Sequence, residues 1–159
     1  MKITVISVGK IKEKYLTEAV KEYSKRLSRY CKLEIIELAD EQTPDKAGEA
    51  LELLIKKKEG ERILKSLKED SYVTALAING RKLTSEAFAG QIETLGVQGK
   101  SHISFVIGGS LGLDEEVLKR ADYLLSFSDM TFPHQLMRVI LLEQIYRSFR
   151  IINHEPYHK

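Results

Sequence analysis

The sequence contains very little cysteine and no long apolar run, and each absence excludes a class of protein. Cys31 is the single cysteine in 159 residues, which excludes an internal disulfide and a metal cage built from cysteines. No apolar stretch approaches the roughly 20 residues that a membrane-spanning helix requires. The opening segment "MKITVISVGK" is typical of a strand rather than of a signal peptide. We therefore expect a cytoplasmic protein with no membrane partner and no bound metal.

The chain also lacks internal repeats, low-complexity segments and linkers. Its hydrophobic fraction of 43% and charged fraction of 30% are those of an ordinary globular protein that can bury a substantial core. We therefore expect one domain that spans residues 1–159.

Positive charge is concentrated at the start of the chain. Residues 1–32 contain nine Lys and Arg against three Glu, whereas residues 33–79 have a net charge of −4. A basic helix attracts a phosphate backbone, but a solvated helix face accounts for the same pattern. The pI of about 8.5 is below the value of about 9 that marks strongly nucleic-acid-binding domains. Charge alone therefore leaves RNA binding open.

Segments whose apolar residues recur with the period of a strand alternate along the chain with segments that have the period of a helix. We expect strands at residues 2–8, 33–38, 71–78, 102–107 and 123–128. We expect helices at residues 12–30, 49–68, 84–95, 114–120 and 133–150. The third strand should end at the turn dipeptide Asn79-Gly80. This alternation predicts an α/β fold with a mostly parallel sheet and helices on both faces.

The last expected helix, "HQLMRVILLEQIYRSFR", is apolar nearly all the way round for two turns. A helix with only one face on a core would keep a polar stripe there. The simplest explanation is that the helix is buried twice, once against its own sheet and once against a second copy. We therefore expect a homodimer through this helix.

Three glycines follow the fourth expected strand in "FVIGGSLGLDEEV", at positions 108, 109 and 112. The loop lacks the GxG spacing of a dinucleotide site and does not follow the first strand, where that motif usually stands. It contains no Lys or Arg, and Asp114, Glu115 and Glu116 occupy the helix start where a phosphate would bind. The loop is therefore either a tight turn with acidic capping or a site for a nucleoside without phosphates.

Two neighbouring strand ends favour the nucleoside. In open parallel sheets, ligands bind beyond the carboxyl ends of adjacent strands. Here those ends carry "ALAINGR", "VIGGSLG" and "SFSDMTFPHQLMR". Polar backbone groups and apolar side chains on three converging loops suit a purine held by main-chain hydrogen bonds.

The motifs "IGGSLGL", "LSFSDMTFPHQLMRVILLEQIYR" and "NHEPYHK", together with the "NG" dipeptide, resemble the SPOUT-class methyltransferases. Within that class the sequence is similar, over essentially its full length, to the RlmH family of large-subunit pseudouridine N3-methyltransferases. The resemblance implies a homodimer that binds S-adenosylmethionine in a deep trefoil knot, formed by roughly residues 103–159. It also implies methylation of N3 of a pseudouridine in helix 69 of 23S rRNA on assembled ribosomes.

The resemblance further implies which residues form the site. The cofactor would be bound at the three loop ends by Leu76, Gly108, Phe127, Ser128, Asp129, Met130, Thr131 and Phe132. The polar tail would close over the site, and its residues His154 and Lys159 would meet the RNA.

The uracil N3–H must lose its proton as the nitrogen attacks, so the site needs a proton acceptor. His158, Tyr157 and His134 are the candidates, and Arg138 could stabilise charge that develops on the base carbonyls. Two other functions remain open from the sequence: a SPOUT methyltransferase that acts on tRNA, and a ribosome-associated protein that binds S-adenosylmethionine without turnover. The absence of an added RNA-binding domain argues mildly against tRNA.

Overall fold

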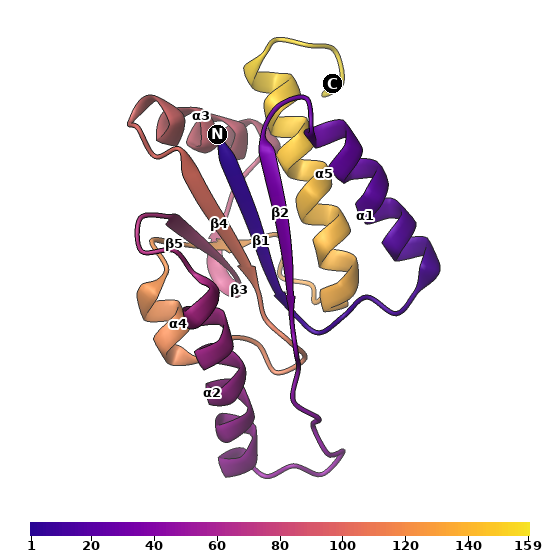
Figure 1. Ribbon diagram of the computed structural model, residues 1–159, viewed down its shortest axis with the longest axis vertical. Coiled ribbons are helices and arrows are strands. Elements are labelled where there is room, and N and C mark those ends of the chain that lie inside the picture. The colour runs from indigo at the N-terminus through magenta and orange to yellow at the C-terminus, as the bar shows by residue number, and fades with distance from the viewer.

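A five-stranded sheet organises the computed structural model, which describes all 159 residues (Figure 1). The strands are β1 (Lys2–Val8), β2 (Lys32–Leu38), β3 (Tyr72–Lys82), β4 (His102–Ile107) and β5 (Tyr123–Ser126). They lie in the order β2-β1-β4-β3-β5, and every neighbouring pair is parallel. The carboxyl ends of the strands therefore meet at one edge of the sheet.

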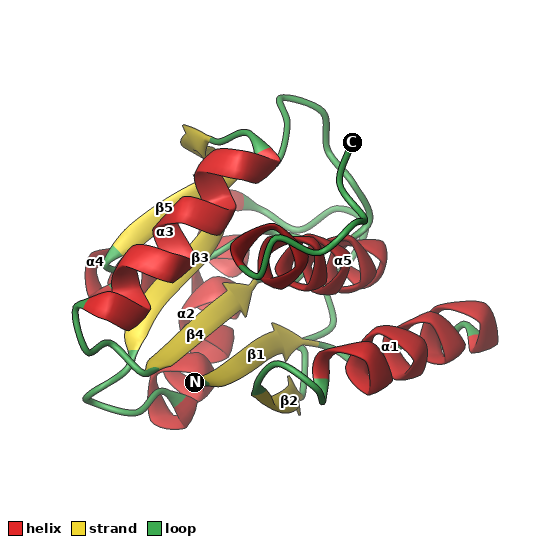
Figure 2. Cartoon of the chain, turned by 90° about the horizontal axis from the view of Figure 1, so that it is seen from above, coloured by secondary structure: helices red, strands yellow, loops and turns green.

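Helices cover both faces of this sheet, as parallel strands require because each crossover returns over a face. The helices are α1 (Lys14–Leu27), α2 (Glu49–Ser66), α3 (Ser85–Val97), α4 (Glu115–Arg120) and α5 (His134–Ile152). α1, α3 and α5 pack on one face, with α5 between the other two, and α2 and α4 pack on the opposite face (Figure 2).

Alternating side chains of β1 divide the core into two layers. Ile3 and Val5 pack with residues of α1, α3 and α5, whereas Ile6 and Val8 pack with residues of α2 and α4. All four side chains are at most 1% exposed. A strand covered on both faces requires this period of two, and the expected α/β fold is confirmed.

The structure contains all ten expected elements. β1 and β4 have the expected bounds, and the helix ends differ from expectation by a few residues. Thr84 caps α3, because its side-chain oxygen accepts a hydrogen bond from the backbone N–H of Ala87 at 3.0 Å. Every helix is too short or too polar to span a lipid bilayer. The trefoil knot stays a prediction.

β3 departs from the sequence expectation, because it continues to Lys82 and the predicted turn at its Asn-Gly dipeptide is wrong. Leu125 of β5 is in register with Leu76 and again with Arg81. Residues 77–80 therefore bulge out of the ladder between these two registers. Bulges of this kind often lie beside functional sites.

α5 is covered within one chain by the sheet, α1 and α3, which accounts for much of the apolar character that we attributed to a second copy. Leu136, Val139 and Ile140 nevertheless belong to neither core layer and are only half-buried. Their spacing of three and four residues places them on one face of the helix. The homodimer through this helix stays a prediction.

The bulge in β3 depends on the absence of a side chain at Gly80. A Cβ at this position would stand 2.7 Å from the carbonyl carbon and oxygen of Leu124, which is backbone that cannot move aside cheaply. We expect Gly80→Ala to lower the free energy of unfolding by about 1–3 kcal/mol, measured by urea denaturation. Gly90→Ala is the matched control, because a Cβ there meets nothing within 4 Å; equal stabilities of the two variants would contradict this account.

Candidate functional site

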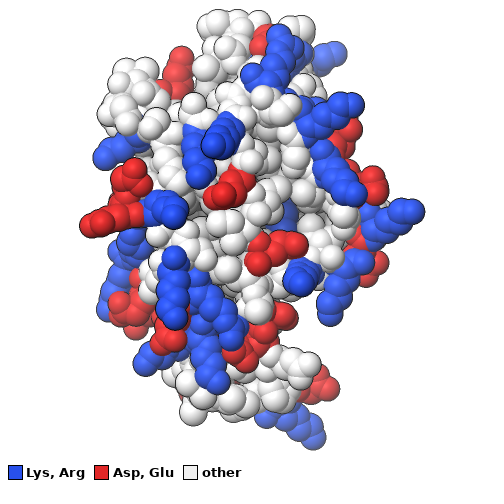
Figure 3. Space-filling model, viewed as in Figure 1, with Lys and Arg blue, Asp and Glu red and all other residues white.

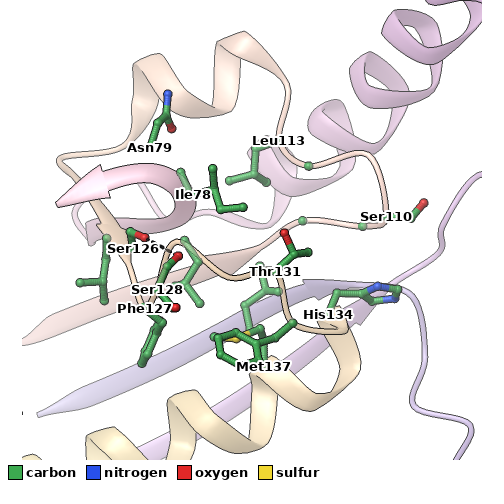
Figure 4. Close-up of a pocket in the computed structure, with 18 of the residues that line it drawn as sticks. Ile78, Asn79, Ser110, Leu113, Ser126, Phe127, Ser128, Thr131, His134 and Met137 are labelled. Carbon is green, nitrogen blue, oxygen red and sulfur yellow. Dashed lines mark hydrogen bonds between the residues drawn. The ribbon is translucent and has the colours of Figure 1, made fainter. Parts of the chain in front are cut away.

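A pocket of about 810 Å³ opens at the carboxyl ends of β3, β4 and β5, within the range of roughly 300–1,000 Å³ typical of small-molecule sites. It is the meeting point of the three loops that the sequence predicted to converge. Figure 4 shows Ile78 and Leu113 on one side of this space and Phe127 and Met137 on the other. The wall consists of residues 76–79, 107–113, 125–128 and 130–134, with Leu118 and Met137.

The glycine loop, residues 108–112, closes on itself by backbone contact. The N–H of Gly112 donates to the carbonyl of Gly109 at 3.1 Å, and Gly112 has a φ of +88°, which favours glycine. A Cβ on Gly108 would lie 2.9 Å from the carbonyl of Gly112. Gly108 therefore allows the loop to close on itself, and it also lines the pocket.

Asp114 caps α4, because its carboxylate accepts a hydrogen bond from the N–H of Glu116 at 3.3 Å. The carboxylate occupies the positive end of this short helix, where it would repel a phosphate. The tight turn with acidic capping is thus present, and the same loop also forms a pocket wall.

The loop after β5 is held by its own serines. The Ser126 hydroxyl donates to the carbonyl of Ser128 at 3.1 Å, and the Ser128 hydroxyl accepts from the N–H of Met130 at 3.0 Å. Asp129 points outward, where it is 81% exposed and pairs with Lys82. The carboxylate that we expected near the cofactor therefore does not line the pocket.

The pocket wall carries no Lys, Arg, Asp or Glu, and His134 is its only titratable side chain. Burial, followed by the nearby charge of Arg138, lowers the pKa of His134 below its ordinary value, and Asp40 opposes this shift. The imidazole is therefore neutral at pH 7 and can accept a proton. It begins α5 at the pocket rim (Figure 4).

Arg138, which we expected to face the acceptor base, is 2% exposed and does not line the pocket. Its guanidinium donates to Glu37 at 2.7 Å and to the carbonyl oxygens of Val8 at 3.1 Å and Gly9 at 2.7 Å. These bonds join the start of α5 to the ends of β1 and β2. Because His134 lies one turn before Arg138 on α5, we assign Arg138 a positioning role.

The C-terminal tail, residues 153–159, folds back against helices of its own chain. The Tyr157 hydroxyl donates to Glu143 at 3.1 Å, and the His158 ring nitrogen Nε2 lies 2.7 Å from a carboxylate oxygen of Glu86. Burial, followed by the charge of Glu143, raises the pKa of Tyr157 to about 12. The phenol therefore keeps its proton at neutral pH.

This tail lies at the opposite end of α5 from the pocket of the same chain. α5 has 19 residues, which rise about 28 Å, and no tail residue lines the pocket. His154 has a φ of 55°, and both His154 and Lys159 are exposed. The tail of one chain therefore does not close over its own pocket.

The pocket brings together seven of the eight residues expected to bind a cofactor, all except Asp129. They are Leu76, Gly108, Phe127, Ser128, Met130, Thr131 and Phe132. The sequence placed the segment "ALAINGR" at the site but predicted neither the β3 bulge nor a role for its residues Ile78 and Asn79. The Asn-Gly dipeptide was the available signal, but it was interpreted as the end of the strand.

The chain is similar over its length to one family of enzymes. Residues 1–158 match the family described as "Predicted SPOUT methyltransferase". Proteins named "Ribosomal RNA large subunit methyltransferase H" are 67% identical in Bifidobacterium adolescentis and 63% identical in Clostridium beijerinckii. Each of these two alignments covers 100% of both proteins.

A solved structure described as "a probable methylase family protein from Haemophilus influenzae Rd KW20" has a TM-score of 0.52 and is 15% identical. The match covers 99% of this chain and 70% of that chain. At this identity the likeness supports the fold alone.

Gly108→Ala should open the glycine loop, because the added methyl group would collide with the carbonyl of Gly112. We expect the affinity for S-adenosylmethionine, the cofactor that the sequence resemblance implies, to fall by roughly tenfold or more. Isothermal titration calorimetry measures this, and Gly90→Ala should bind as the unmodified protein does. An unchanged affinity would show that the glycine loop does not contribute to the binding site.

Arg138→Met tests whether this residue holds the structure or acts on the substrate. The change removes one of the two donors to Glu37, which keeps the N–H of Ile11, and leaves two carbonyl groups without the guanidinium, so we expect a loss of about 2–3 kcal/mol in the free energy of unfolding. Arg26→Met removes the same charge from an exposed pair with Glu22 and should cost about 0.5 kcal/mol or less. Lost activity with unchanged stability would instead favour a direct role in catalysis.

Proposed function

We propose, on the premise that the chain belongs to the SPOUT methyltransferase family, that it methylates 23S rRNA with S-adenosylmethionine. The proposed acceptor is N3 of a pseudouridine in helix 69 on assembled ribosomes. The observation that carries the proposal is the uncharged, glycine-walled pocket at three strand ends, in a chain 63–67% identical to rRNA methyltransferases over its full length. The resemblance of the loop and tail motifs supports the acceptor position.

The pocket residues fit an adenosine without phosphates. Leu76, Ile78 and Leu113 offer apolar surface to a purine, and the glycine loop exposes backbone N–H and carbonyl groups. The neutral wall and the capped start of α4 disfavour phosphate. S-adenosylmethionine contains an adenosine and a sulfonium but no phosphate, which agrees with this pattern.

When bound, the cofactor supplies a methyl group that is already activated by the sulfonium. The chain must then hold the acceptor nitrogen about 3 Å from that carbon and in line with it, a positioning that accounts for several kcal/mol. His134, neutral and at the rim, is the side chain of this pocket that can take the N3 proton. Tyr157 is a poor base because of its raised pKa, but its hydroxyl can still donate a hydrogen bond.

The tail is proposed to act on the pocket of a second copy. A tail at the far end of α5 reaches a pocket only if a partner brings that pocket to it. Leu136, Val139 and Ile140 supply an apolar face at the pocket end of α5, which suits a twofold contact between two such helices. Each site would then combine one chain's loops with the other chain's His158 and Lys159.

Basic residues beside the pocket support an RNA acceptor. The loop between β1 and α1 carries Lys10 and Lys12, and α1 begins with Lys14; none of the three has an acidic partner within 4 Å. The backbone N–H of Lys12 donates to Gln135 at 3.3 Å, next to His134. Tyr15 is 70% exposed and offers a face for a base. Figure 3 shows further Lys and Arg side chains over α1, with acidic ones among them.

The direct test uses purified protein, labelled S-adenosylmethionine, and intact ribosomes, free rRNA or tRNA as acceptors. We expect label in 23S rRNA of assembled ribosomes, at N3 of one pseudouridine by mass spectrometry. Label in tRNA alone would show that the acceptor is tRNA and not 23S rRNA. Cofactor binding without transfer to any acceptor would indicate a protein that binds the cofactor without turnover.

Co-expressed variants test whether the tail acts in the partner's site. One variant lacks residues 154–159 and keeps its pocket, and the other carries Gly108→Val and keeps its tail. Each should be inactive alone, and the heterodimer should regain activity because it contains one complete site. Two inactive homodimers that form an inactive heterodimer would place the tail in the site of its own chain.

A further inference from the structure

The proposed cofactor carries a positive sulfonium, yet no carboxylate lines the pocket. Asp129, which stands between two pocket residues in the sequence, is turned outward to Lys82. Asp114 is engaged by the N–H of Glu116 at the start of α4. A third carboxylate, Glu59 of α2, lies directly behind the glycine loop.

Glu59 is 5% exposed and lies against the pocket wall at Gly109 without lining the cavity itself. Its two carboxylate oxygens lie 3.2 and 3.4 Å from the position that a Cβ of Gly109 would occupy. Gly109 itself lines the pocket. One residue of backbone, without a side chain, therefore separates this carboxylate from the ligand space.

The position of Glu59 in α2 is one that an apolar residue would ordinarily fill. It stands between Ile55 and Ile63 at a spacing of four residues, and both are buried. A buried carboxylate is costly unless its oxygens are compensated. Glu59 has one hydrogen bond, in which Oε2 accepts from the N–H of Glu41 at 3.0 Å, whereas Oε1 has no donor within the protein and is not fully enclosed.

Gly60, the next residue, brings α2 close enough for this contact. A Cβ at this position would lie 2.8 Å from the Cβ of Asp114, so no larger residue fits between α2 and the start of α4. Glycine inside a helix costs about 1 kcal/mol relative to alanine. Glu59 and Gly60 therefore bring α2 into contact with the glycine loop at Gly109 and with Asp114, which follows the loop.

The other charges near Glu59 do not neutralise it by direct contact. Burial raises the pKa of Glu59, Asp40 and Glu41 raise it further, and the Glu41 N–H and Arg62 oppose the shift. Arg62 itself is paired with Glu41 at 2.5 Å. A cation on the far side of Gly109 would add a stabilising charge that this carboxylate lacks.

We propose that Glu59 is a specificity-determining residue that favours the cationic cofactor over its neutral product, acting through the backbone of Gly109. The inference rests on the proposed function, because it requires S-adenosylmethionine in this pocket. Transfer of the methyl group converts the sulfonium to the thioether of S-adenosylhomocysteine, so the attraction exists before the reaction and is lost after it. The residue therefore helps to exchange product for fresh cofactor.

The test compares the affinities of two ligands that differ in charge but share their adenosine and amino-acid groups. Isothermal titration calorimetry with the full chain measures dissociation constants for S-adenosylmethionine and S-adenosylhomocysteine. We expect Glu59→Gln to weaken S-adenosylmethionine about three- to tenfold, as expected for one screened charge interaction. The affinity for S-adenosylhomocysteine should change less than about twofold, because the glutamine oxygen still accepts from the N–H of Glu41.

Two further variants separate charge from loop support. Glu61→Gln removes the same charge from the exposed side of α2 and should leave both affinities unchanged. Glu59→Asp keeps the charge and should retain the preference for S-adenosylmethionine even if the shorter side chain weakens both ligands. Equal loss of both ligands in Glu59→Gln, or no loss of either, overturns the proposal. Failure of the unmodified protein to bind either ligand would instead overturn the proposed function on which it rests.

Discussion

The pocket depends on close approach of backbone to backbone at two places where no side chain fits. Gly80 lies against the carbonyl of Leu124, and Gly108 lies against the carbonyl of Gly112, each within 3 Å of where a Cβ would stand. The first contact holds the bulge of β3 against β5, and the second closes the glycine loop after β4. A methyl group at either position would push two pocket walls apart. The rigid sheet beneath them, with its two apolar layers, keeps these contacts in register.

Charge is arranged around the pocket rather than in it. Buried Arg138 pairs with the more exposed Glu37 on the side of His134, and Glu59 lies behind Gly109 on another. Fixed charges behind a neutral wall act on a ligand in surroundings of low dielectric constant, where their effect is larger than in water. The arrangement leaves apolar surface and backbone groups to contact a ligand, and Glu59 is the charge that we propose discriminates between ligands of different charge.

The direction and length of α5 determine where the C-terminal tail lies relative to the pocket. Its first residue, His134, is at the pocket, whereas the tail that follows its last turn folds back only as far as the middle of α5 and the start of α3, through contacts such as Tyr157 to Glu143 and His158 to Glu86. These contacts order the tail on its own chain but present it away from its own pocket. The half-buried apolar face of α5 gives a physical reason for two chains to associate, and association is what would supply each pocket with a tail.

The sequence alone determined the ten elements, the α/β class and the three loops that meet, because periodicity and turn residues are local properties. Through its resemblance to the SPOUT methyltransferases, the sequence also indicated seven residues that line the pocket. Tertiary structure alone decided that Asp129 faces Lys82, that Arg138 is buried under the rim, and that β3 bulges at Gly80 instead of turning. It also decided that Glu59, in a different helix, lies behind Gly109. Each of these depends on contacts between segments distant in the chain, and the period of a single segment carries no information about its neighbours in space.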